Sequence, residues 1–169
     1  LEPVDLLAEA AHRAEADAGV TNLLAGLDSI RVVSILSWRY TDPGRLVAER
    51  VGATVARTTY TTGGGQTPQA LVHRVAEDVL AGRADAVLIG GAEAWRTARA
   101  ARRAGETPAW ADQAGSAPDE LVGTGRMSAL DAGFDTRASG VTLDRFCGSG
   151  ITANNIAATA VLSGMEDLV

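Results

Sequence analysis

The 169-residue chain has one cysteine, few aromatic residues, and no hydrophobic run that approaches the ~18 residues of a membrane-spanning helix. A single cysteine excludes an internal disulfide framework and is typical of the reducing cytoplasm. Acidic residues outnumber basic ones, giving a net charge of −6, and no basic stripe stands out. We therefore expect a cytoplasmic protein that contacts neither a membrane nor a nucleic acid.

The N-terminus lacks the basic and apolar regions of a signal peptide, and it lacks an initiator methionine, so we expect a truncated start. What the chain does contain is typical of a globular domain, with 46% hydrophobic residues, 21% charged residues and 19 glycines. Its length is sufficient to bury a hydrophobic core of ordinary size.

Hydrophobic periodicity over residues 1–90 predicts helices that alternate with strands. Asp42 followed by Pro43 indicates a helix N-cap with proline in the first helical position. Residues 85–90 form an apolar run without polar alternation, which is typical of a strand buried on both faces of a parallel sheet. The alternation predicts an α/β fold with a parallel or mixed sheet and helices on both faces. The expected helices are residues 3–19, 43–51 and 68–82, and the expected strands are residues 29–36, 57–62 and 85–90.

Residues 107–118 interrupt this pattern. Prolines and glycines among polar residues make this stretch the best candidate for a linker. After it, residues 119–132 predict a weak helix that is interrupted by glycines. Before it, the arginines from Arg96 to Arg103 fall on an alanine-rich helical stretch, where we expect a solvated face. The linker candidate therefore separates one α/β unit from the rest of the chain.

The only cysteine, Cys147, lies where a strand leads into a helix. Residues 141–146 alternate apolar and polar side chains as a strand does, and the chain then turns through Gly148 and Gly150 into an alanine-rich helix that ends at Gly164. Unpaired N–H groups and the helix dipole at such an N-terminus favour a thiolate. Glycines beside it let a substrate carbonyl approach the backbone. We interpret Cys147 as a candidate nucleophile.

Two other interpretations of the same residues stay open. A lone cysteine is often a small buried residue with no chemistry. In addition, Gly148, Gly150 and Ala153 fit the dinucleotide fingerprint G-x-G-x-x-A between a strand and a helix. That fingerprint requires an acidic residue at the end of the second strand, roughly 20 residues further on. Here Glu166 and Asp167 precede the next apolar run instead.

The glycine turn and the helix after it occur twice. A shift of 82 positions lays Gly65 on Cys147 and also Gly82 on Gly164. Strand, glycine turn, helix and the start of the next strand all coincide, which indicates a duplicated supersecondary unit. The first copy has glycines and Gln66 around the position where the second has its cysteine, so only the second copy could carry a cysteine nucleophile.

A family resemblance is carried by the run Val141-Thr-Leu-Asp-Arg-Phe-Cys147-Gly-Ser-Gly, the helix after it, and the stretch Ser163-Gly-Met-Glu-Asp-Leu-Val169. Over residues 122–169 the chain resembles the N-terminal domain of thiolases, the acetyl-CoA acetyltransferases. Residues 1–110 are similar to a different thiolase-like acetyltransferase without that cysteine, through Thr-Thr-Gly-Gly-Gly-Gln-Thr-Pro-Gln and Ile89-Gly-Gly-Ala-Glu-Ala-Trp95. Residues 111–121 are then a linker or fusion junction, and the resemblance implies an incomplete thiolase-like layered fold.

The resemblance implies acyl transfer to and from coenzyme A. Cys147 matches the acyl-accepting cysteine of the family, which forms a thioester with the acyl group. The carbanion of a second acyl-CoA attacks this thioester in the condensation direction, and thiolytic cleavage is the reverse reaction. The Cys147 backbone N–H would form part of an oxyanion hole. Coenzyme A and acetyl-CoA are then substrates, with no tightly bound cofactor and no metal. The family also implies a homo-oligomer, either a dimer or a tetramer.

The chain departs from the family in the partners of its cysteine. The family uses a histidine from a Gly-His-Pro segment and a second cysteine from a Cys-x-Gly segment. Here His12 and His73 both fall in expected helices outside residues 122–169, and no second cysteine is present. We therefore expect a fragment of a lipid-metabolism acyltransferase with little or no turnover by itself. The alternative is a non-catalytic thiolase-like binding or scaffold protein in which Cys147 is structural.

Overall fold

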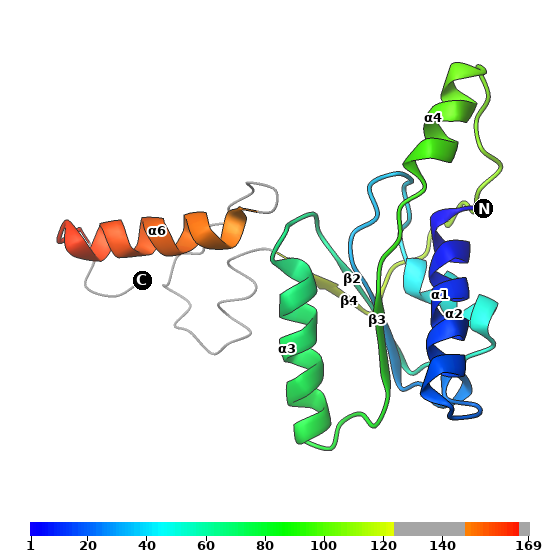
Figure 1. Cartoon of the computed structure of the whole chain (residues 1–169), viewed down its shortest axis with the longest axis horizontal. Coiled ribbons are helices and arrows are strands. Elements are labelled where there is room, and N and C mark those ends of the chain that lie inside the picture. The colour runs from blue at the N-terminus through cyan, green and yellow to red at the C-terminus, as the bar shows by residue number, and fades with distance from the viewer. Residues whose placement is uncertain (124–147, 166–169) are drawn as a thin grey trace.

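The computed structural model describes residues 1–123 and 148–165, and within them it contains a four-stranded sheet flanked by helices (Figure 1). The strands are β1 (Ser29–Val32), β2 (Arg57–Thr61), β3 (Val87–Gly90) and β4 (Glu120–Val122). Their order across the sheet is β3-β1-β2-β4, and every pairing is parallel. The predicted α/β class with a parallel or mixed sheet is therefore confirmed, and the pairings of the described sheet are parallel.

Helices cover both faces of this sheet, as predicted. α1 (Pro3–Ala18) and α2 (Pro43–Val51) lie together on one face, and α3 (Thr67–Leu80) lies on the other (Figure 1). The steps from β1 to β2 and from β2 to β3 run in opposite directions across the sheet, so right-handed crossovers place their helices on opposite faces. The other described helices are α4 (Trp95–Arg103), α6 (Ser149–Leu162) and the 3-10 turn η1 (Leu24–Gly26). In the described ranges, no helix has the length and apolar character to cross a membrane.

Local sequence signals set the two ends of α2. Asp42 Oδ1 accepts a hydrogen bond from Arg45 N at 3.1 Å, and Pro43 occupies the start of the helix, where no N–H donor is needed. Gly52 ends the helix with φ 71°, a left-handed conformation in which a side chain would be strained. The N-cap and helix predicted from Asp42 and Pro43 are therefore confirmed.

The two faces of the sheet bury different kinds of side chain. Ile30 and Val32 belong to one apolar cluster with Val47 of α2 and the buried residues of α1. Arg31, between them on the strand, points to the opposite face and pairs with Asp78 of α3. The hydrophobic core therefore lies between the sheet and the α1–α2 layer.

The first strand is shorter than predicted. β1 ends at Val32 instead of continuing through the whole apolar run to residue 36. Beyond it, Ser34 N donates to Thr61 Oγ1 at 2.9 Å and Ile35 N donates to the Tyr60 hydroxyl at 3.0 Å. These side chains of β2 replace the backbone partners of a strand, so the apolar run continues as a loop.

The third strand is not buried on both faces, so that prediction is wrong. β3 is half-buried along its whole length. It lies at the edge of the described sheet, where its partner is β1. Central and edge strands can have the same apolar sequence. The burial of such a strand depends on its place in the strand order, which the run itself does not reveal.

The helix predicted over residues 119–132 is wrong at its start. Residues 120–122 form β4 beside β2, and Thr58 N donates to Asp119 Oδ2 at 2.7 Å. Gly123 follows with φ 140°, and a Cβ there would collide with Thr62 Oγ1. Pairing with the edge of β2 therefore overrides a weak helical preference. Residues 124–132 lie outside the described residues.

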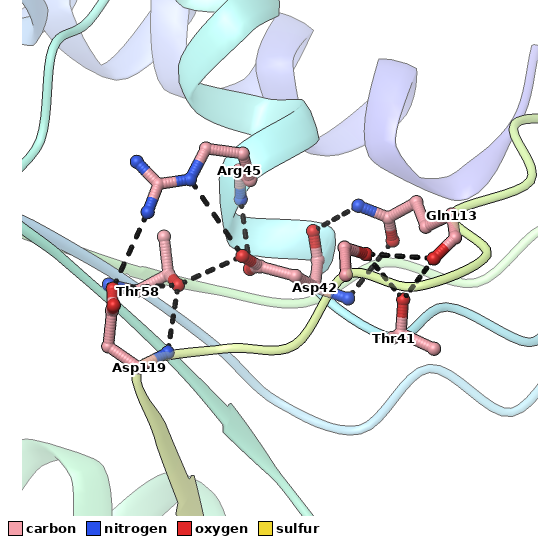
Figure 2. A network of polar contacts seen from close by, with 7 residues as sticks. Thr41, Asp42, Arg45, Thr58, Gln113 and Asp119 are labelled. Carbon is pink, nitrogen blue, oxygen red and sulfur yellow. Dashed lines mark hydrogen bonds and ion pairs between the residues drawn. The ribbon is translucent and has the colours of Figure 1, made fainter.

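Residues 107–118 are irregular, as predicted, but hydrogen bonds attach them to the body of the fold (Figure 2). Gln113 donates through Nε2 to Asp42 O at 2.6 Å and accepts from Asp42 N at 3.0 Å. Trp110 packs edge-on against Trp38, with ring centroids 5.1 Å apart. The segment is therefore part of the packed fold here, and its role as a junction between two domains stays a prediction.

The duplicated unit is visible in the helices. Helix α6 begins and ends 82 positions after α3, from Thr67 and Leu80 to Ser149 and Leu162. The glycines that follow both helices adopt left-handed φ values, 66° in the first copy and 71° in the second. The predicted duplication is confirmed for the helix and its C-terminal glycine, and α6 starts two residues before the predicted Ile151.

Candidate functional site

The predicted nucleophile turn is described from Gly148 onwards. Cys147 and the strand predicted over residues 141–146 lie outside the described residues, so the role of the cysteine stays a prediction. Gly148 is the N-cap of α6, which begins at Ser149. The cysteine is therefore followed directly by a helix N-terminus, where unpaired N–H groups and the helix dipole favour an anion.

The dinucleotide interpretation also stays a hypothesis. Gly150 and Ala153 lie in the first turns of α6, whereas Glu166 and Asp167 lie outside the described residues. A Cβ added at Gly150 would meet nothing within 4 Å. Packing among the described residues therefore gives no reason for a glycine at this position.

Neither histidine is placed as a buried acid or base. His12 is exposed on α1, and His73 is exposed on α3 with its Nε2 2.9 Å from Gln69 Nε2. The two helices lie on opposite faces of the sheet (Figure 1). Over residues 1–123 and 148–165, no cluster of three or more histidine, cysteine or carboxylate side chains could hold a metal ion.

A pair of carboxylates between α2 and β4 is engaged by donors from the protein itself. Thr58 Oγ1 lies 3.1 Å from Asp42 Oδ2 and 3.3 Å from Asp119 Oδ2, and Arg45 approaches both carboxylates (Figure 2). The hydrogen bond from Thr58 N, together with that from its hydroxyl and the charge of Arg45, holds the pKa of Asp119 below its ordinary value. We interpret this cluster as structural.

The described residues form a pocket at the carboxyl ends of the strands. Its volume is about 440 Å³, and the loop between β1 and α2 forms most of its wall, with Tyr60 from β2 and Arg102 from α4. In α/β sheets ligands bind at this edge, between strands whose connections leave to opposite faces, as those of β1 and β2 do. We did not predict this pocket from the sequence, although Trp38-Arg39-Tyr40 after a buried strand is a signal that could have indicated it.

Hydrogen bonds fix the wall of this pocket. Glu93, which follows β3, accepts from Leu36 N at 2.7 Å and from Ser37 N at 2.8 Å through its two carboxylate oxygens. Ser37 Oγ in turn accepts from Ala94 N at 3.0 Å. The loop after β1 is therefore held by the loop after β3 through these hydrogen bonds. Glu93 belongs to the stretch that carries the weaker family resemblance, and here it holds a loop.

Tyr40 contributes to the wall but is unsuited to proton transfer. Its hydroxyl donates to Glu2 Oε2 at 2.8 Å, and both residues are buried. Burial raises the pKa of Tyr40, and the hydrogen bond to Glu2 raises it further. Glu2 also accepts from Ala111 N at 2.9 Å and pairs with Arg50. The phenol therefore stays neutral at physiological pH and serves to join the N-terminus to the pocket loop.

Comparison with known proteins leaves the family of this chain open. No protein-family model matches it, and no curated protein matches it significantly. Among solved structures, the chain is similar to a monomeric SCP2-thiolase-like protein type 1 from Mycobacterium smegmatis, with 31% identity and a TM-score of 0.47. The similarity covers 53% of this chain and 20% of that protein, so the chain spans about a fifth of its length. With so low a TM-score, the likeness assigns neither a family nor an activity.

Proposed function

We propose that this chain is part of a coenzyme A-dependent acyltransferase of the thiolase type, with Cys147 as the residue that accepts the acyl group. The observation that supports this most is the turn Cys147-Gly-Ser-Gly150, in which the only cysteine directly precedes the N-terminus of α6. A helix N-terminus lowers the pKa of a thiol and so raises the fraction of nucleophilic thiolate. The resemblance of residues 122–169 to thiolases supports the substrate class.

In the proposed reaction, the Cys147 thiolate attacks the thioester carbonyl of an acyl-CoA. The carbonyl oxygen becomes an oxyanion, which the Cys147 backbone N–H helps to stabilise. The bond to the coenzyme A sulfur then breaks, coenzyme A leaves as a thiolate that takes up a proton, and the acyl group stays on Cys147. A base then removes the α-proton of a second acyl-CoA, and the resulting carbanion attacks the acyl-cysteine thioester. This attack forms a carbon–carbon bond and releases the Cys147 thiolate. Thiolytic cleavage is the reverse.

The proposed chemistry needs a base that the described residues do not supply. His12 and His73 are both exposed on helices, and Cys147 is the only cysteine. Catalytic groups of this kind act as a unit, so the loss of one lowers the rate by orders of magnitude. We therefore propose that the chain by itself has little or no turnover and stops at the acyl-cysteine stage. The family resemblance also suggests a dimer or tetramer, which light scattering on the purified chain would measure.

Because Cys147 is the only cysteine of the chain, every thiol reaction that is measured can be assigned to it. We expect alkylation by iodoacetamide to follow an apparent thiol pKa clearly below ~8.5, the value of a free cysteine. Incubation with acetyl-CoA should add one acetyl group, detected by intact-mass spectrometry. The matched control is Cys147→Ser, which should take up neither label.

An unreactive thiol would favour the alternative function. If Cys147 reacted with iodoacetamide only after the chain is unfolded, the cysteine would be a buried structural residue. The exposed positions of both histidines are the observation that favours this alternative, a non-catalytic thiolase-like binding or scaffold protein. In that case the behaviour of the protein would depend on residues 1–110.

A further inference from the structure

The pocket at the carboxyl ends of β1 and β2 has two arginines in its wall. Arg39 comes from the loop after β1, and Arg102 comes from α4, which extends beyond that end of the sheet (Figure 1). We propose that this pocket binds a phosphate-bearing small molecule. Its phosphate lies between the guanidinium groups of Arg39 and Arg102, and its apolar part lies against Leu36 and Trp38. This site is separate from the proposed function of Cys147.

Among the described residues, both arginines lack a carboxylate partner. Over residues 1–123 and 148–165, neither the Arg39 nor the Arg102 guanidinium has an ion pair or a hydrogen bond. Elsewhere in the described structure, carboxylates pair with the arginines Arg13, Arg31, Arg45, Arg50, Arg74 and Arg83. Although the chain has an excess of acidic residues, the part that the structure describes therefore leaves two cations unpaired in the wall of one pocket.

The charges around the pocket favour an anion. Two carboxylates contact the pocket loop, and both are already engaged. Glu93 accepts the Leu36 and Ser37 amides through its two oxygens, and Glu2 accepts from the Tyr40 hydroxyl and pairs with Arg50. The remaining arginines of α4 add positive potential to the same end of the molecule, although Arg99 lies over the Trp95 ring at 5.9 Å. Guanidinium groups recognise phosphate oxygens through paired hydrogen bonds. Phosphate is therefore the chemical group that fits this wall.

The size and lining of the pocket set the rest of the ligand. A volume of about 440 Å³ is within the range of sites for small molecules. Leu36 is 66% exposed beside the two cations, and Trp38 is half-buried. A ligand with an apolar group next to its phosphate would cover this surface. A nucleic acid fits less well, because the chain as a whole carries a net charge of −6.

In the experiment, the full chain is titrated with inorganic phosphate and, separately, with phenyl phosphate. Calorimetry and tryptophan fluorescence measure the dissociation constant of each. We expect both probes to bind and phenyl phosphate to bind more tightly. Arg39→Ala and Arg102→Ala should each weaken binding by roughly 10-fold, the effect of losing one charge-assisted contact. Leu36→Ser should reduce the affinity for phenyl phosphate towards that for inorganic phosphate.

The matched control is Arg103→Ala, which removes the same charge from the neighbouring position of α4. Because Arg103 does not line the pocket, we expect a change of less than about twofold. Equal losses in Arg103→Ala and Arg102→Ala would overturn the proposal in favour of a diffuse positive surface. So would the absence of binding, or binding that Arg39→Ala and Arg102→Ala leave unchanged.

Two further variants separate this proposal from folding defects and from the acyltransferase proposal. The substituted arginines are exposed, so their variants should unfold at the wild-type temperature. Arg102→Gln, which keeps the bulk of the side chain, should weaken binding as Arg102→Ala does. Cys147→Ser should bind phenyl phosphate as the wild type does, so either proposal can fail while the other stands.

Discussion

The two faces of the sheet are held by different interactions, although the same strands form both. Towards α1 and α2, Ile30 and Val32 are fully buried in an apolar cluster. Towards α3, Arg31 pairs with Asp78, and Thr59 Oγ1 donates to Glu120 Oε2 at 3.2 Å. Burial of apolar area stabilises without regard to direction, whereas the gain from a buried ion pair is largely offset by desolvation. We infer that the first face provides stability and that the second orients α3.

The solvent-facing sides of α1 and α3, the helices on the two faces of the sheet, also differ in the kind of side chain that they expose. α1 presents charged residues such as Glu9 and Arg13 to solvent, where they pair with each other. α3 instead exposes Val72, Val79 and Leu80. In the part of the chain that the structure describes, α3 therefore exposes more large apolar side chains than α1, where Leu6 is 36% exposed, although α3 also exposes polar residues such as His73 and Glu77.

The largest expected effect is on the apolar face. Ile30→Ala should lower the free energy of unfolding by about 4 kcal/mol, because it leaves a cavity at a fully buried position. Chemical denaturation measures the change, and Ile30→Val is the matched control with an expected loss of about 1 kcal/mol. A loss no larger for Ile30→Ala than for Ile30→Val would contradict the position of the core.

The second effect is on the ion pair. Arg31→Met should lower the free energy of unfolding by about 2 kcal/mol, because it leaves Asp78 without its buried partner. The loss is smaller than for a fully buried pair, since Asp78 is 15% exposed and keeps Arg83 at 2.8 Å. The double variant Arg31→Met with Asp78→Leu should recover most of the loss in a double-mutant cycle. If the double variant were as unstable as Arg31→Met alone, the Arg31–Asp78 ion pair would stabilise the fold more than the apolar contact between Met and Leu that replaces it.

The Arg31–Asp78 pair also predicts that the free energy of unfolding depends on pH. The hydrogen bond from Arg31 holds the pKa of Asp78 below its ordinary value of 3.8, although burial opposes the shift. A carboxyl with a lowered pKa in the folded state stabilises the fold above its unfolded pKa. That stabilisation is lost as the pH falls through 3.8 towards the folded pKa. The double variant should therefore lose less stability than the wild type between roughly pH 5 and pH 2, and equal slopes would contradict this.

The smallest expected effect is on the outer side of α3. Leu80 is 88% exposed, so Leu80→Ser should change the free energy of unfolding by less than about 0.5 kcal/mol. The contrasting variant on the same helix is Leu71→Ala, which should cost several times more because Leu71 is fully buried. A cost for Leu80→Ser close to that of Leu71→Ala would mean that this face is covered in solution.

Much of the fold could be predicted because its signals are local. Asp42 and Pro43 begin α2, and Gly52 ends it, by capping that involves only neighbouring residues. The shift of 82 positions predicted that the helix after Cys147 would match α3, and the two helices do correspond. The alternation of helices and strands also implied a parallel or mixed sheet with helices on its faces, and the described sheet is parallel. For the candidate site, the same local reasoning placed a helix N-terminus directly after the only cysteine.

Tertiary structure decided what depends on partners far away in the chain. β1 ends at Val32 because the amides of the next residues, Ser34 and Ile35, donate to side chains of β2 instead of to a strand backbone. β4 forms because β2 offers a free edge. The pocket wall joins Arg39 to Arg102 only because β1 and β3 are neighbours in the sheet. Local propensity is a property of adjacent residues, so the sequence determined the helices, their caps and the α/β class. Strand ends, the edge position of β3 and the pocket depend on which elements become neighbours, so only packing could decide them.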